Sequence, residues 1–122
     1  MRRDVSRGNL ELVGTVLQDF AAREAARCEQ ERQHILAALR AALEELLPRS
    51  EVVWVHGSLA RPGRFGDDSD VDLALERRPS AFSEYWLQGE LELRLGRRVD
   101  VTLLSETRLR EKIEREGLRW TL

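Results

Sequence analysis

Several features that mark large classes of protein are scarce in this sequence. Cys28 is the only cysteine in 122 residues, so an intramolecular disulfide is impossible and an oxidising compartment is not indicated. No apolar run approaches the ~20 residues that a membrane-spanning helix needs. Residues 1–14 also lack the continuous apolar core of a secretory signal. These absences make a cytoplasmic protein without a membrane partner the expectation.

A basic excess is also missing. The 22 acidic and 20 basic residues give a formal net charge of -2, and the two signs are interleaved along the chain. A protein that grips long nucleic acid through many phosphates usually presents a basic face, so we expect no such binding here. A single nucleotide is still compatible with this charge, because a metal ion can neutralise its phosphates locally.

Residues 9–47 are expected to be helical, because apolar side chains recur at helical spacing towards both ends of the segment. Asn9 would cap the start, and Pro48 would end the helix because proline disfavours the α conformation in the residue before it. The middle of the segment is mostly charged or alanine, with a thin apolar stripe. Either one long helix or two helices joined near residues 23–29 would fit this pattern.

Three short segments have the pattern of strands: residues 52–55, 70–75 and 99–104. A fourth, residues 118–122, would be a short edge strand. Residues 58–69 contain one proline and two glycines and are expected to form a loop that opens with one helical turn.

Two further helices are expected between and after these strands. Ser80 would cap a helix that ends at Gly96, and Ser105 would cap a helix that ends at Gly117. Residues 91–95 also alternate, so a strand there is an open alternative. The order of elements predicts one domain of the α/β (α+β) class, with helices packed on a small mixed sheet.

Three aspartates carry the candidate chemistry. The two-residue period of a strand places Asp70 and Asp72 on one face, and Asp100 points the same way if its strand is a neighbour. Two carboxylates ~5 Å apart repel by roughly 3 kcal/mol at an effective dielectric of ~20, which a bound cation would relieve. Oxygen ligands of this kind suit Mg²⁺, and three aspartates can hold two such ions. Asp68 and Asp70 form an alternative pair, but only Asp70 and Asp72 alternate with aliphatic residues.

A glycine and a serine supply the complementary half of the site. Gly57 follows the first strand and lets the backbone approach a bulky anion. The backbone N–H and hydroxyl of Ser58 would then cradle phosphates at the start of a helical turn, with Arg61 one turn further on. Each feature alone is weak, because a Gly-Ser pair is usually a turn and alternating acids are usually a solvated face.

Together, residues 56–61 (HGSLAR), 68–73 (DSDVDL) and 98–101 (RVDV) resemble the minimal nucleotidyltransferases of the DNA polymerase β superfamily. The resemblance covers residues 30–122 as a nucleotidyltransferase domain and leaves residues 1–29 as an N-terminal helical extension. It implies that Asp70, Asp72 and Asp100 bind two Mg²⁺ ions and that Ser58 contacts the phosphates of ATP. It also implies that Asp100 helps to activate the acceptor hydroxyl.

The resemblance further implies a partner. Relatives of this size are commonly paired with a small helical HEPN toxin, so the chain would be an antitoxin that silences the toxin by transferring AMP to it. Two alternatives stay open: an antitoxin that acts by contact alone, and a small-molecule nucleotidyltransferase that works as a dimer. The apolar face of residues 10–21 favours some interface, self-association included.

The remaining conspicuous side chains have simpler interpretations. His56 is expected to pack or to form hydrogen bonds rather than to act in catalysis. Trp54, Phe82 and Trp86 are core candidates. The arginine pairs at residues 77–78 and 97–98 are expected to be exposed charges at strand ends.

Overall fold

The computed structural model describes residues 2–122 of the chain, with side chains from Leu12 onward. The elements in chain order are α1 (Arg2–Leu46), β1 (Val52–His56), the 3-10 turn η1 (Gly57–Ala60), β2 (Val71–Leu75), α2 (Glu84–Leu95), β3 (Val99–Leu103), α3 (Arg110–Glu116) and β4 (Leu118–Thr121). Among the described residues, no helix is both long enough and apolar enough to cross a bilayer.

The four strands form one mixed sheet in the order β3-β2-β1-β4. Strand β1 runs antiparallel to both β2 and β4, whereas β2 and β3 are parallel. This arrangement confirms the predicted small mixed sheet and the predicted edge strand near the C-terminus. It also makes β2 and β3 neighbours, on which the predicted grouping of aspartates depends.

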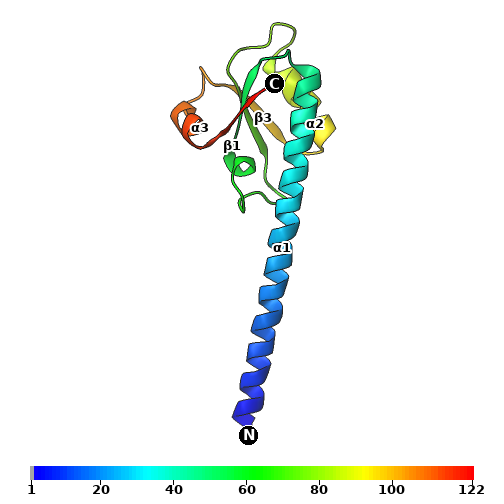
Figure 1. Cartoon of the computed structure of the whole chain (residues 1–122), viewed down its shortest axis with the longest axis vertical. Helices are drawn as coiled ribbons and strands as arrows, with labels where there is room; N and C mark the ends of the chain where they lie inside the picture. The colour runs from blue at the N-terminus through cyan, green and yellow to red at the C-terminus, as the bar shows by residue number, and fades with distance from the viewer. Residues whose placement is uncertain (1) are drawn as a thin grey trace.

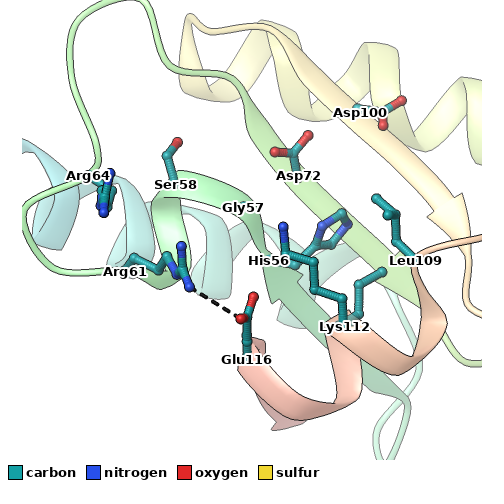
Figure 2. A pocket seen from close by; sticks show the side chains of 11 residues that line it. His56, Gly57, Ser58, Arg61, Arg64, Asp72, Asp100, Leu109, Lys112 and Glu116 are labelled. Atoms are coloured by element: carbon teal, nitrogen blue, oxygen red, sulfur yellow. Dashed lines mark ion pairs between the residues drawn. The ribbon is translucent and has the colours of Figure 1, made fainter.

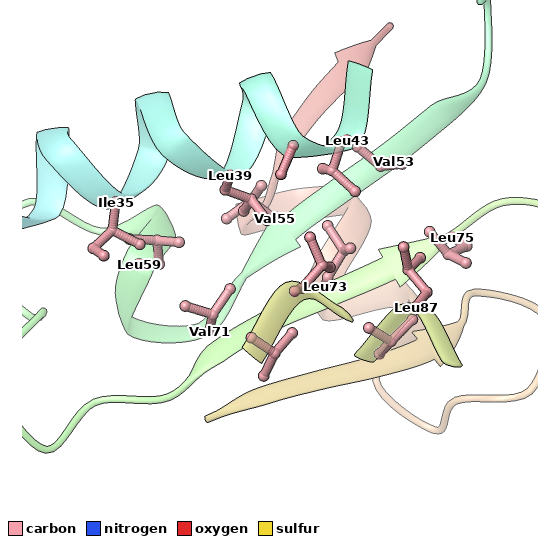
Figure 3. Packing of buried hydrophobic residues seen from close by; sticks show 14 of the residues in the cluster. Ile35, Leu39, Leu43, Val53, Val55, Leu59, Val71, Leu73, Leu75 and Leu87 are labelled. Carbon is pink, nitrogen blue, oxygen red and sulfur yellow. The ribbon is translucent and has the colours of Figure 1, made fainter. Parts of the chain in front are cut away.

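The two faces of the sheet are covered differently (Figure 1). One face packs against α1 and α2 and forms the main core, with Leu39 and Leu43 from α1 and Leu87 from α2 fully buried (Figure 3). The other face carries a small second cluster, in which Ile113 of α3 packs against Ala74. Because α3 has only seven residues, it covers part of this face and leaves room for a site.

Helix α1 is a single helix, which decides between the two alternatives left by the sequence. It begins at Arg2, so the prediction that Asn9 caps its start is wrong; the side chains of Asn9 and Leu10 lie outside the described ones. Buried apolar side chains of α1 begin only at Ile35, and the preceding part of the helix projects from the domain (Figure 1). The apolar residues there are exposed: Leu12, Val13, Val16, Leu17 and Phe20.

The predicted N-cap of α2 is wrong by three residues. Ser83, not Ser80, caps this helix, and its hydroxyl accepts a hydrogen bond from the N–H of Trp86 at 3.1 Å. The helix buries Leu87 and Leu91 at i, i+4 spacing, which rules out the alternative strand at residues 91–95. Gly96 ends it in the left-handed conformation (φ 64°), as predicted.

The predicted start of α3 is also wrong. Ser105 lies in a turn in which the N–H groups of Glu106 and Thr107 both donate to the carbonyl of Leu103. The Thr107 hydroxyl then accepts from the N–H of Leu109 at 3.2 Å. In a helix capped by Ser105, the N–H of Leu109 would donate to the Ser105 carbonyl; here it donates to the Thr107 hydroxyl instead, and α3 begins only at Arg110.

Candidate active site

Three polar residues form a row across the sheet on the face that α3 partly covers. His56 at the end of β1 pairs with Asp72 of β2, and Asp72 pairs with Asp100 of β3. Side chains alternate between the two faces of a strand, so all three point away from the main core. Asp72 and Asp100 therefore lie next to each other on this face, as predicted, and Figure 2 shows the two carboxylates side by side.

A pocket of about 400 Å³ opens above this row. Its walls come from the end of β1, the turn η1, the following loop, the two strands with aspartates, and α3 (Figure 2). The lining residues are His56, Gly57, Ser58, Arg61, Arg64, Asp72, Asp100, Leu109, Lys112, Ile113 and Glu116. Five of the six predicted site residues are among them, and Asp70 is the exception.

Gly57 brings the backbone of η1 directly against the Asp72 carboxylate. Its φ is +69°, a conformation that residues with a Cβ rarely adopt. A Cβ built on Gly57 would collide with Oδ2 of Asp72 and lie 3.2 Å from its Cγ. Glycine is thus required by both conformation and space, and the turn carrying Ser58 sits at the edge of the carboxylate pair.

The Asp72 carboxyl has the most perturbed acidity at the site. Burial, and then the charges of Asp100 and Asp70, raise its pKa from 3.8 to about 6. The ionised form is therefore unfavourable here unless a positive charge lies nearby. A bound cation would supply that charge.

The position of Asp70 differs from the prediction. It is exposed, lies one residue before β2 and does not line the pocket, although it is close enough to raise the pKa of Asp72. Among the described side chains, from Leu12 onward, no three His, Cys, Asp or Glu residues are gathered closely enough to hold a metal ion. Mg²⁺, however, is usually bound through only one or two carboxylates together with phosphates and waters. Asp72 and Asp100 fit that donor set.

The alternative aspartate pair is not supported by the geometry. Asp68 lies exposed in the loop, and its neighbour Asp67 pairs with Arg27 of α1 at 2.9 Å. Of the residues in the two overlapping pairs, only Asp72 enters the pocket.

Cations line the side of the pocket opposite the aspartates. Arg61 is tied to Glu116 by an ion pair of 3.3 Å (Figure 2). Arg64 and Lys112 form no ion pair within the described part of the chain. Arg64, Lys112 and Leu109 are not among the site residues that the sequence predicts. Leu109, Lys112 and Glu116 recur at helical spacing, and that spacing could have shown that they share a face.

His56 borders both the aspartates and Lys112. Burial lowers the pKa of its imidazole, the Asp100 charge opposes this, and the Lys112 charge adds to it. Its Nε2 atom is buried and has no hydrogen-bond partner among the described residues. The hydrogen bond expected for His56 is thus not formed at Nε2, and the ring lines the pocket.

Two expectations for other side chains are wrong. Trp86 is 47% exposed rather than part of the core, whereas Phe82 and Trp54 are partly buried against core residues. The side chain of Arg97 is only 13% exposed, because carbonyl groups of the 61–70 loop surround its guanidinium. Arg77, by contrast, is exposed as predicted.

Comparison with known proteins shows similarity to one protein family and to solved structures. Residues 36–120 match the protein family described as "Nucleotidyltransferase domain". One similar solved structure is described as "Crystal structure of the toxin-antitoxin with AMP-PNP"; its chain superposes with a TM-score of 0.57 at 20% identity. The match covers 70% of this chain and 73% of the other. No curated protein matches the sequence.

Proposed function

Because the chain belongs to the nucleotidyltransferase domain family, we propose that it transfers AMP from ATP to a hydroxyl group of a partner protein. One observation carries this proposal: the turn of Gly57 and Ser58 and the paired carboxylates of Asp72 and Asp100 line the same pocket. Its volume of about 400 Å³ lies in the range of small-molecule sites.

The cations and the turn are suited to the triphosphate. Ser58 offers a hydroxyl and a backbone N–H at the first turn of η1, next to the glycine that leaves space for an anion. Arg61, Arg64 and Lys112 face the same space and would bind phosphate oxygens through charge-assisted hydrogen bonds.

Asp72 and Asp100 would hold Mg²⁺, and Asp70 would complete a second ion site. When bound, the metal would neutralise phosphate charge and polarise the reacting phosphorus. This assignment fits the raised pKa of Asp72, because a group that is hard to ionise alone becomes a good ligand beside a cation.

In the proposed reaction, the acceptor hydroxyl oxygen forms a bond to the α-phosphorus of ATP. The bond from that phosphorus to the oxygen bridging to the β-phosphate breaks, and pyrophosphate leaves with the electron pair. Asp100 accepts the hydroxyl proton, which requires the acceptor to reach the exposed β3 side of the pocket. The cations opposite stabilise the pyrophosphate as its charge increases.

The proposed acceptor is a HEPN-type helical toxin, which would make the chain an antitoxin acting in the cytoplasm. The similar fold of a chain from a toxin–antitoxin structure with AMP-PNP supports this partner class. In this proposal, residues 30–122 are the catalytic domain and residues 1–29 are an extension.

One observation favours a second candidate function, neutralisation of the toxin by contact without chemistry. The projecting part of α1 exposes Leu12, Val13, Val16, Leu17 and Phe20, five large apolar side chains with no cover within the described chain. A toxin or a second copy of this chain could bury them.

Intact-mass spectrometry of the toxin separates the two functions. Incubation with ATP, Mg²⁺ and the wild-type chain should add one or more AMP groups, and Asp100→Asn should add none. If the toxin is neutralised without gaining mass, and removal of residues 2–25 abolishes neutralisation, the contact function is correct instead.

A further inference from the structure

Arg97 lies just before β3, outside the pocket, and binds the turn that leads to Asp70. Its Nη1 atom donates hydrogen bonds to the carbonyls of Gly66 and Ser69, both at 3.0 Å, and approaches the carbonyl of Asp67 at 3.3 Å. Three backbone acceptors in four consecutive residues thus meet at one guanidinium. An arrangement of this kind fixes a loop more firmly than any single bond does.

Two further contacts hold the Arg97 side chain itself in place. Its guanidinium carbon lies 4.3 Å from the centroid of the Phe65 ring, and Phe65 is a buried member of the main core. Glu31 of α1 forms an ion pair with this guanidinium at 3.7 Å. Arg97 therefore connects the 66–69 turn to the core and to α1, and it is not free to follow a moving loop.

The backbone on both sides of Asp70 is held by hydrogen bonds to Arg97 and Arg98. The Ser69 carbonyl that Arg97 binds belongs to the peptide bond joining Ser69 to Asp70. On the other side of Asp70, the N–H of Val71 donates to the carbonyl of Arg98 at 2.9 Å. The turn is also closed on itself, because the Ser69 hydroxyl accepts from the N–H of Gly66 at 2.9 Å. Residues 97 and 98 thus set where Asp70 stands relative to Asp72 and Asp100.

We propose that Arg97 is a positioning residue for metal-dependent nucleotide binding, acting through the Asp70 backbone. The inference rests on the proposed function, in which Asp70 contributes to a Mg²⁺ site. Asp70 stands one residue before β2 and does not line the pocket, so the position of its backbone, which this turn fixes, decides how near its carboxylate comes to those of Asp72 and Asp100. Arginine suits this task better than lysine because its planar fork serves several acceptors while stacking on an aromatic ring.

The test is a Mg²⁺ titration of the binding of a non-hydrolysable ATP analogue, measured by fluorescence or calorimetry on the full chain. Arg97→Met keeps much of the apolar stem and removes every donor. We expect its half-saturating Mg²⁺ concentration to rise about tenfold, at the lower end of the effect of removing groups that orient metal ligands. Nucleotide affinity without Mg²⁺ should stay unchanged, because the Ser58 turn is not held by Arg97.

Arg77→Met is the matched control, since Arg77 is 75% exposed and pairs with Glu51 away from the pocket. Its Mg²⁺ response should equal that of the wild type. If melting shows Arg97→Met to be unfolded, Arg97→Lys takes its place, with an expected rise of about twofold to threefold because one donor group can still bind one carbonyl.

The outcomes are distinguishable. An unchanged Mg²⁺ response in the folded Arg97 variant overturns this inference alone. So does an equal loss of affinity with and without Mg²⁺, which would show a general effect on the fold. No Mg²⁺ response in the wild type overturns the proposed function and this inference with it.

Discussion

Replacing Asp72 by asparagine removes a carboxylate whose pKa is raised to about 6 by burial and by the charges of Asp100 and Asp70. When an acid has a higher pKa in the folded state, folding favours its protonated form. Without ligand, the wild type should therefore lose stability as the pH rises from about 4 to about 6 and stay at that lower level above it. Asparagine does not ionise and avoids this loss.

The size of the effect follows from the shift of about two pKa units, which corresponds to ~3 kcal/mol at full strength. Asp72 is only half-buried, so solvent screening reduces the expected gain of Asp72→Asn to about 1–2 kcal/mol at pH 8. For a chain of this size, that gain raises the melting temperature by roughly 3–10 °C. At pH 4 the two proteins should melt within about 2 °C of each other, because both side chains are then mostly neutral.

Thermal and urea unfolding between pH 4 and pH 8 measure this difference. Asp68→Asn is the control, since Asp68 is an exposed acid in the neighbouring loop; its stability should match the wild type within about 0.5 kcal/mol at every pH. Mg²⁺ with a non-hydrolysable ATP analogue should then raise the melting temperature of the wild type and of Asp68→Asn, but not that of Asp72→Asn. The reasoning fails if Asp72→Asn is less stable than the wild type at pH 8, or if the difference does not depend on pH.

Three other changes, one of them with a matched glycine control, test the site and the elements that support it. Gly57→Ala should abolish nucleotide binding and destabilise the fold by about 2–3 kcal/mol, because strain at φ +69° adds to the collision with Asp72. Gly63→Ala has a similar φ of +78° with nothing within 4 Å of the added Cβ, so it should cost only ~1 kcal/mol in urea unfolding. Arg32→Met should destabilise the protein by about 2 kcal/mol, because the buried guanidinium donates to the Leu59 carbonyl at 2.8 Å; a loss below 0.5 kcal/mol would contradict this role. Lys112→Ala should weaken nucleotide affinity by about tenfold in calorimetry and leave the melting temperature unchanged, since no described residue pairs with Lys112; unaltered affinity would remove it from the phosphate site.

The sequence predicts the sheet side of the site well. Strand periodicity places Asp72 and Asp100 on the open face, and the structure pairs them in register. A glycine after a strand likewise predicts the turn at Gly57, since its reason is local geometry. The face on which Asp72 and Asp100 lie follows from the two-residue period of a strand, and the turn at Gly57 follows from one backbone angle.

The remaining features depend on contacts between distant segments. The sequence predicts Arg97 to be an exposed charge, but its burial depends on carbonyl groups about 30 residues away along the chain. The start of α2 is not decided by residue type, because serine is a good cap at both position 80 and position 83. The hydrogen bond from the N–H of Trp86 to the hydroxyl of Ser83 identifies the cap, and it is known only from the structure. Asp70 shares the alternation with Asp72, yet it stands before the strand begins and does not line the pocket.

Transfer of label from ATP to the toxin tests the central claim most directly. With Mg²⁺ and the wild-type chain, ATP labelled on the α-phosphate should label the toxin, and ATP labelled on the γ-phosphate should not. Asp100→Asn should leave the toxin unlabelled in both cases. Label arriving from the γ-phosphate, or equal α-label with Asp100→Asn, would contradict the account.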